Sequence, residues 1–187
     1  MKVLQFELWQ ECNNKCEFCY LGSNIEHTAD QTKIESLKRT INMIDNIDPS
    51  YEVVAFIGGE FFQGQLKNQT VRALFFELME KTAHLLDSNR IKEVWISVTL
   101  TIGKQADLFK TIELFKDKSR LWLLTSWDSM GRFHSPKMEQ TWQDNMKRIH
   151  ALYPEIKLNT TIILTGHFIS LYLLNKFNLN SFSAEYN

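Results

Sequence analysis

The stretch Tyr51-Glu-Val-Val-Ala-Phe-Ile57, followed directly by Gly58-Gly59-Glu60, says most about the fold. Its residues are apolar, β-branched or aromatic almost without interruption, which is typical of a strand in a parallel sheet that is covered on both faces. Two consecutive glycines then allow a tight turn in which the backbone approaches another group closely. We therefore expect a buried parallel strand that ends in an open turn, with the Glu60 carboxylate at its mouth.

Strand and helix patterns alternate along the rest of the chain. Strands are predicted at residues 3–9, 51–57, 93–100, 120–125 and 156–164, and each precedes a segment with helical periodicity. Ser135 and Pro136 are expected to begin the fourth helix, as its N-cap and first-turn residue. Five such units predict a parallel α/β sheet flanked by helices. A closed barrel of eight units needs about 250 residues, so the 187 residues of this chain predict an incomplete (βα) barrel of about five to six units.

No linker, repeat or low-complexity segment divides the sequence, so residues 1–187 are predicted to form one domain. A fifth helix is expected around residues 168–177, and residues 178–187 are too few for a sixth strand and helix. The chain is then either a minimal example of its fold or a fragment. An exposed strand edge is usually covered. The candidates for covering the edge after the fifth strand are residues 178–187, a second copy of the chain, or a large substrate, which we favour.

The composition predicts an ordinary globular protein, with 44% hydrophobic and 23% charged residues. A formal net charge of -1 gives no general attraction to nucleic acid or to an anionic membrane. No apolar stretch is long enough for a transmembrane helix, and the N-terminus lacks the apolar core of a signal peptide. We expect a cytoplasmic protein without a membrane partner, and nucleic acid is not favoured as a partner.

All three cysteines of the chain lie in Cys12-Asn-Asn-Lys-Cys16-Glu-Phe-Cys19. An odd number of clustered cysteines argues against a disulfide framework. Cysteine thiolates are the usual ligands of iron–sulfur clusters, and three ligands on a four-iron cubane leave one iron open. The alternative is a structural zinc site with Cys₃His coordination, in which His27 is the fourth ligand.

The C-x₃-C-x₂-C spacing, with aromatic Phe18 before the third cysteine, resembles the signature of the radical S-adenosylmethionine (radical SAM) enzymes. The Gly-Gly-Glu turn at the end of the next strand resembles the second motif of that family. The family often has proline after the glutamate, where this chain has Phe61. The two motifs together favour a cluster over zinc. The resemblance implies a partial barrel in which Cys12, Cys16 and Cys19 bind a [4Fe-4S] cluster and SAM chelates the open iron.

The resemblance also implies roles around SAM for residues at the ends of the strands. Glu60, with carbonyl groups of Gly58 and Gly59, would hold the methionine amine, and the backbone around Phe18 and Tyr20 would border the adenine. After the fourth strand, Ser126 and Asp128 suit the ribose hydroxyls and Arg132 suits the carboxylate. As the alternative, Ser-x-Asp before a helix is an ordinary turn pattern and the arginine is a solvated charge. Further polar or ligand-facing candidates are Thr99, Thr101, Trp127, Thr161, Ile163 and Thr165.

Radical SAM chemistry starts when the reduced cluster gives one electron to the sulfonium of SAM. The family then produces methionine and a 5′-deoxyadenosyl radical, which takes a hydrogen atom from the substrate. A reductant such as flavodoxin or ferredoxin is implied, and no catalytic acid or base can be assigned. No cysteine remains for an auxiliary cluster. A peptide or protein substrate is favoured, with a nucleoside-type metabolite as the alternative. The non-enzymatic alternative is a zinc or iron–sulfur module for binding or electron transfer.

Overall fold

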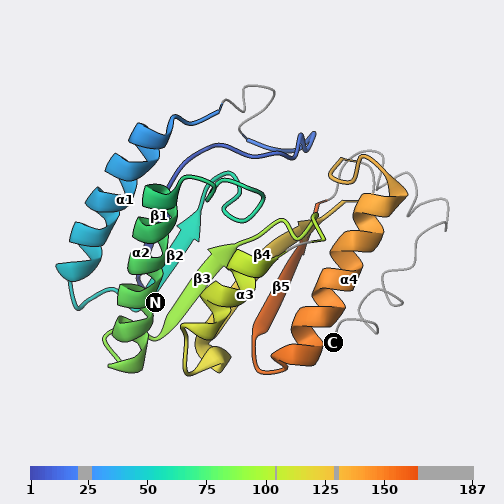
Figure 1. Ribbon diagram of the computed structural model, residues 1–187. Helices are drawn as coiled ribbons and strands as arrows, with labels where there is room; N and C mark the ends of the chain where they lie inside the picture. The colour runs from blue at the N-terminus through green and yellow to red at the C-terminus, as the bar shows by residue number, and fades with distance from the viewer. Residues whose placement is uncertain (21–26, 104, 129–130, 164–187) are drawn as a thin grey trace.

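The computed structural model describes residues 1–20, 27–103, 105–128 and 131–163 (Figure 1). Strands and helices alternate in the order β1 (Val3–Glu7), α1 (Asp30–Asp45), β2 (Val53–Ile57), α2 (Gln69–Asp87), β3 (Glu93–Ser97), α3 (Ala106–Glu113), β4 (Leu121–Trp127), α4 (Pro136–Leu152) and β5 (Lys157–Ile162), with a short 3₁₀ helix, Lys118–Arg120, before β4. The five predicted strands and the first four predicted helices are confirmed, with somewhat different ends. Across these ranges, no helix is both long and apolar enough to cross a membrane.

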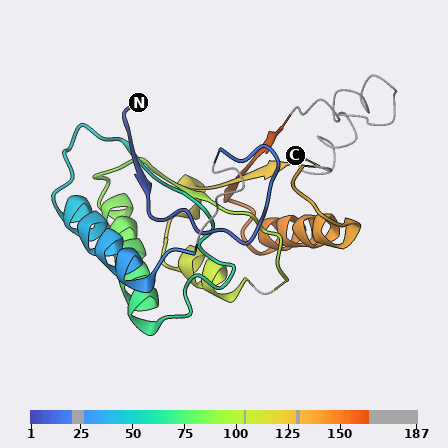
Figure 2. The ribbon, with the colours of Figure 1, turned by 90° about the horizontal axis from the view of Figure 1, so that it is seen from above.

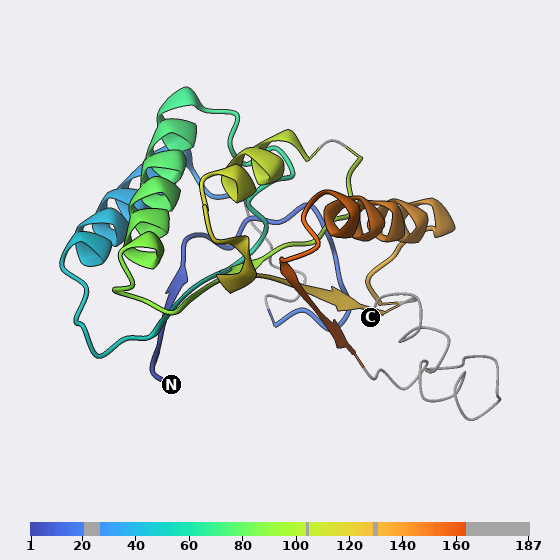
Figure 3. The ribbon, with the colours of Figure 1, turned by 90° about the horizontal axis from the view of Figure 1, so that it is seen from below.

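The strands form one sheet in the order β1-β2-β3-β4-β5, and every neighbouring pair is parallel. The labelled helices all lie on the same face of this sheet (Figures 2 and 3). The architecture confirms the predicted parallel α/β sheet, since an open sheet of consecutive βα units is a partial barrel. The predictions for residues 165, 168–177 and 178–187 lie outside the described residues.

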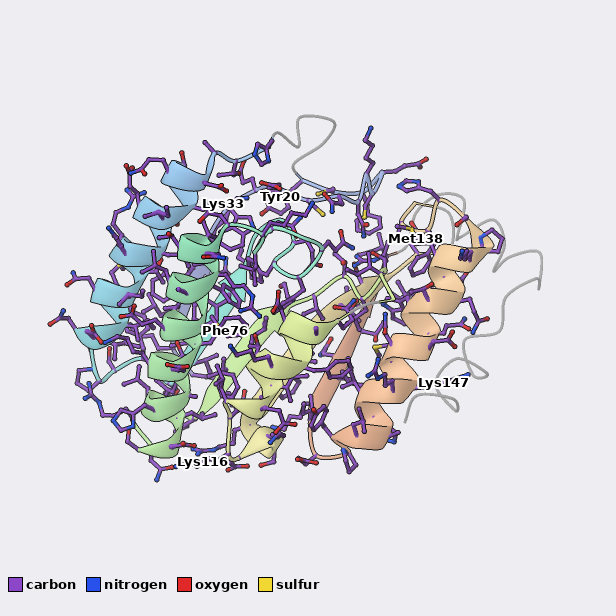
Figure 4. The ribbon with its side chains drawn as sticks, in the orientation of Figure 1. Tyr20, Lys33, Phe76, Lys116, Met138 and Lys147 are labelled. Carbon is purple, nitrogen blue, oxygen red and sulfur yellow. The ribbon has the colours of Figure 1, made fainter. Side chains whose placement is uncertain are left out.

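The core lies between the sheet and its helices. Alternate strand residues face the helices, as the two-residue period of a strand requires. The fully buried contributors include Val54, Phe56, Val94, Ile96 and Leu123 from the strands, and Leu37, Phe75, Leu78, Ile112 and Trp142 from the helices. Burying each large apolar side chain is worth about 1.5–3 kcal/mol. In Figure 4 Phe76 lies on α2, and Lys110 of α3 places its Nζ 4.0 Å from the centre of the Phe76 ring.

The turn between β4 and α4 follows the prediction at one end and departs from it at the other. Ser135 Oγ accepts a hydrogen bond from Met138 N at 3.3 Å, and Pro136 is the first helical residue, so the predicted cap is confirmed. The prediction that Trp127 lies in a ligand-facing loop is wrong. Trp127 is the last residue of β4, is buried, and donates from Nε1 to Glu139 Oε1 at 3.1 Å.

Candidate functional site

The segment between β1 and α1 (residues 8–29) is called the cysteine loop below, and its described residues 8–20 cross the carboxyl ends of the strands (Figure 1). Its first part runs beside the turn after β2: Gly59 N donates to Trp9 O at 2.9 Å and Glu60 N to Glu11 O at 2.8 Å. A Cβ on Gly58, whose φ is +140°, would lie 2.3 Å from Trp9 O, and one on Gly59 would lie 2.0 Å from Glu11 O. The two glycines are therefore required by the close approach of the cysteine loop itself.

The Glu60 side chain has a different position from the one expected. It is 1% exposed, so the prediction that its carboxylate stands at the mouth of the turn is wrong. Oε1 accepts hydrogen bonds from Phe61 N at 2.8 Å and Phe62 N at 2.9 Å, and Oε2 accepts one from Thr99 N at 2.7 Å. The carboxylate thereby links the loop after β2 to the end of β3. Its contact with the SAM amine stays a prediction.

An ion pair holds the cysteine loop to α1. Lys33 on α1 lies beside this loop in Figure 4, its side chain is 2% exposed, and its Nζ is 2.7 Å from Glu11 Oε2. The same oxygen accepts from Thr28 N at 3.2 Å and lies 3.0 Å from His27 Nδ1. Burial opposes ionisation of Glu11, but the hydrogen bond and charge of Lys33 outweigh it and lower the Glu11 pKa. The residue next to Cys12 is therefore fixed against a helix.

A cavity of about 380 Å³ lies where these loops meet, within the size range of small-molecule sites. All three cysteines line it. So do five other residues that were predicted to bind SAM: Phe18, Gly58, Gly59, Ser126 and Arg132. The remaining lining residues are Ser97, Val98, Thr99, Leu124, Thr125, Thr161 and Ile163. The structure thus brings the cysteine motif, the glycine turn, and residues at the end of β4 and beyond it to one site.

Three predicted site residues do not line this cavity. The first is Glu60, described above, and the second is Tyr20. Tyr20 is 71% exposed, and its hydroxyl donates to Glu7 Oε1 at 3.0 Å (Figure 4). Asp128 is fully buried, and its Oδ2 would lie 2.5 Å from a Cβ on Gly131. The backbone carbonyl of Asp128 accepts from Arg132 N at 3.2 Å, so this residue helps to build the turn. The SAM-binding roles of these residues stay predictions.

Arg132 places a buried positive charge in the wall of the cavity and is only 6% exposed. Its Nη1 donates to Ser126 Oγ and its Nη2 to Thr99 O at 3.3 Å. Within the described part of the chain its Nε has no hydrogen-bond partner. Burial lowers the pKa of Arg132, while the negative charge of the Cys16 thiolate opposes that shift. An arginine held in this way can donate hydrogen bonds to an anion in the cavity.

The thiols themselves are poor anions in the absence of a metal. Burial raises the pKa of Cys12 to about 11, and nearby acidic groups add to the shift, whereas a hydrogen bond from Asn14 N to Cys12 Sγ (3.4 Å) opposes it. Burial also raises the pKa of Cys16, against the charge of Arg132. A metal at this site must therefore displace protons from the thiols.

The described residues contain no group of three His, Cys, Asp or Glu side chains that converge on a single metal ion. A tetrahedral zinc site, with Zn–S bonds of about 2.3 Å, needs its sulfurs about 3.8 Å apart. The residue expected as the fourth zinc ligand, His27, is instead 76% exposed in its side chain and contacts Glu11. The arrangement does not supply a formed Cys₃His zinc site. The thiolates of a cubane bind different irons and have no such need to converge on one ion.

Sequence reasoning found cavity residues at or beyond the ends of the strands, such as Ser126, Thr161 and Ile163, and missed Ser97, Val98, Leu124 and Thr125. Ser97 pairs with Leu124 across β3 and β4, and Ser126 pairs with Thr161 across β4 and β5. These positions alternate with the residues that face the helices, so they line the opposite face of the sheet. The period-two pattern of β4 would have identified Leu124 beside Ser126.

No known protein-family model matches the sequence, and no curated protein matches it. Among solved structures, native anSMEcpe with bound AdoMet superposes on 94% of this chain with a TM-score of 0.60 and 16% sequence identity. The chain has a radical SAM-like fold. It spans 46% of the length of anSMEcpe, and at this identity the likeness concerns the fold.

Proposed function

We propose that this chain is a radical SAM enzyme, or the core of one, that binds a [4Fe-4S] cluster through Cys12, Cys16 and Cys19. The observation that carries the proposal is that all three cysteines line a single cavity at the carboxyl ends of the strands. Ligands of α/β barrels bind at this end. The radical SAM-like fold supports the same assignment, and the fold neighbour anSMEcpe carries bound AdoMet.

The residues present fit this pair of groups by their chemistry. Three thiols on one cavity are the ligand set of a cubane with one open iron. Arg132, whose buried Nε has no partner among the described residues, is a donor for the SAM carboxylate. Backbone carbonyls of Gly58 and Gly59 would accept from the methionine amine, with Glu60 fixing the turn and contributing its remaining lone pairs.

The remaining predicted SAM-binding residues are assigned roles from their places in or near the cavity wall. Phe18 would border the adenine, together with the backbone near Tyr20, and Ser126 would bind a ribose hydroxyl while it orients the Arg132 guanidinium. Asp128 would bind the ribose hydroxyls together with Ser126. When bound, the cluster and SAM supply one-electron cleavage of the sulfonium and hydrogen abstraction from a substrate. The protein binds and orients these groups and limits the access of water to them.

A flavodoxin or ferredoxin would supply the electron, in a reducing cytoplasmic compartment. We favour a peptide or protein as the substrate. A nucleoside-type metabolite is the alternative. The two are distinguished by adding a candidate of each class to the assay below and measuring which of them increases the release of 5′-deoxyadenosine.

The proposal is tested by anaerobic reconstitution with iron and sulfide, followed by dithionite and SAM. We expect about four irons per chain and the release of methionine and 5′-deoxyadenosine. Cys16→Ala should take up no cluster, because two thiolates do not hold a cubane. Ser97→Ala, which changes the same cavity wall without removing a thiol, should bind iron normally. Stoichiometric zinc without iron uptake, or a cluster that never cleaves SAM, would contradict the proposal.

A further inference from the structure

A buried network of amide and hydroxyl groups lies beside the cysteine loop. Its centre is Gln63, in the loop between β2 and α2, which is 8% exposed. The side-chain Nε2 of Gln63 donates to Thr99 Oγ1 at 2.7 Å and to Thr101 Oγ1 at 2.5 Å. These two acceptors follow β3. One side chain therefore connects the loops at the ends of neighbouring strands.

The same network reaches the cysteine loop at two successive residues. Asn13 Nδ2 donates to the backbone carbonyl of Gln63 at 2.7 Å. Asn14 Oδ1 accepts from Thr101 Oγ1 at 3.2 Å and lies 3.4 Å from Gln63 Nε2. Asn14 is buried, so these bonds form away from water, where hydrogen bonds are strong and their loss is costly.

Asn14 is also the residue that contacts the first thiol. Its backbone N–H donates to Cys12 Sγ at 3.4 Å. A displacement of the Asn14 side chain moves this N–H, because both belong to one residue, which directly follows the bend at Asn13. The network thus connects Gln63 to the position of Cys12. Cys19 is held differently, through its N–H to Cys16 O at 3.1 Å.

We propose that Gln63 is a positioning residue for Cys12. It fixes the backbone at Asn14 through Thr101 and its own backbone carbonyl, and so holds the partly buried Cys12 thiol in the cavity wall at the place where it would bind the cluster. The inference rests on the proposed function for its purpose, since it assigns Cys12 to the cluster. The contacts that it invokes are made by the chain's own residues.

The test measures the rate at which iodoacetamide alkylates each cysteine in the folded, metal-free, full-length chain, by mass spectrometry of the peptides. In Gln63→Leu we expect Cys12 to react roughly fivefold faster or more, relative to Cys19 in the same molecule, because each lost hydrogen bond shifts a local opening equilibrium by about this factor. Thr101→Val should give a change in the same direction, and Thr101→Ser, which keeps the hydroxyl, should retain the wild-type rate.

Gln65→Leu is the matched control. Gln65 is a buried glutamine of the same loop, but neither atom of its amide has a hydrogen-bond partner among the described residues. Its replacement should leave the ratio of Cys12 to Cys19 alkylation unchanged. An unchanged ratio in both Gln63→Leu and Thr101→Val, or an equal acceleration at all three cysteines, would overturn the inference. Because no metal is present, a chain that fails to cleave SAM would refute the proposed function and leave this result standing.

Discussion

Replacement of Glu60 by alanine distinguishes two roles for this side chain, fixing the turn after β2 and binding SAM, because the first affects stability and the second affects SAM affinity. In the structure its carboxylate accepts three backbone hydrogen bonds, from Phe61 N, Phe62 N and Thr99 N, and is almost fully buried. A hydrogen bond to a charged group is worth about 1.5–3 kcal/mol. Three such bonds do not add fully, since water enters the space that Glu60→Ala opens. We therefore expect the free energy of unfolding to fall by about 4 kcal/mol, which is exceptional for one substitution.

The assay is urea denaturation of the metal-free and SAM-free chain, followed by circular dichroism. Glu60→Gln keeps one acceptor oxygen and should lose about 2 kcal/mol, because its amide group cannot accept from the remaining N–H. Glu35→Ala removes an exposed glutamate of α1 and serves as the control, with a change within about 0.5 kcal/mol. If Glu60→Ala is as stable as this control and only its SAM affinity falls, the carboxylate acts on the ligand and the structural reasoning is refuted.

Three further predictions concern the cysteine loop. Gly59→Ala should prevent iron uptake, measured by iron content after reconstitution, because its Cβ would lie 2.0 Å from Glu11 O; normal uptake would show that the loop shifts without cost. Lys33→Met should destabilise the chain by about 1.5–3 kcal/mol at neutral pH, as expected when a partly buried carboxylate loses one charge-assisted hydrogen bond. The pKa of Glu11 is lowered in the folded chain, so the stabilisation by Lys33 is present above the unfolded-state pKa and is lost as the pH falls through the folded-state pKa. The free energies of unfolding of the two proteins, measured with urea, should therefore converge in acid. A constant difference between them at every pH would contradict the pairing. Alkylation of Cys12 in the wild-type chain should rise with pH up to about 11, and a plateau near pH 8.5 would show an unburied thiol.

The strands and helices were predictable because each carries its own periodic pattern. The strand before Gly58 is apolar at every position, and the core-facing positions of α2 recur at helical spacing. The site was predictable to the extent that parallel strands bring their carboxyl ends together, which is a property of the topology. Cys12 and Ser126, far apart in the sequence, therefore meet in one cavity as expected.

The orientation of side chains within the site was not predictable in the same way. The Gly58-Gly59 turn indicated a close approach, but the sequence did not show that the approaching group is the cysteine loop. The direction of the Glu60 carboxylate depends on the N–H of Thr99, which lies in another loop. Gln63 carried no signal at all, because its partners are distant in sequence and meet only when the loops after β1, β2 and β3 are packed.

The cysteine loop is attached to different elements before Cys12 and after Cys16, so the sheet sets the distance between these two attachments. Near Cys12 it is bonded to the turn after β2. Beyond Cys16 it is bonded to the segment after β4, through Glu17 N and Gly131 O at 2.8 Å. Since β3 lies between β2 and β4, the width of the sheet sets the separation of these attachments. A site whose ligands are held by a rigid scaffold keeps its geometry without the metal. The parallel sheet therefore sets the span between the attachment beside Cys12 and the one beside Cys16, whereas Cys19 is held locally through its N–H to Cys16 O.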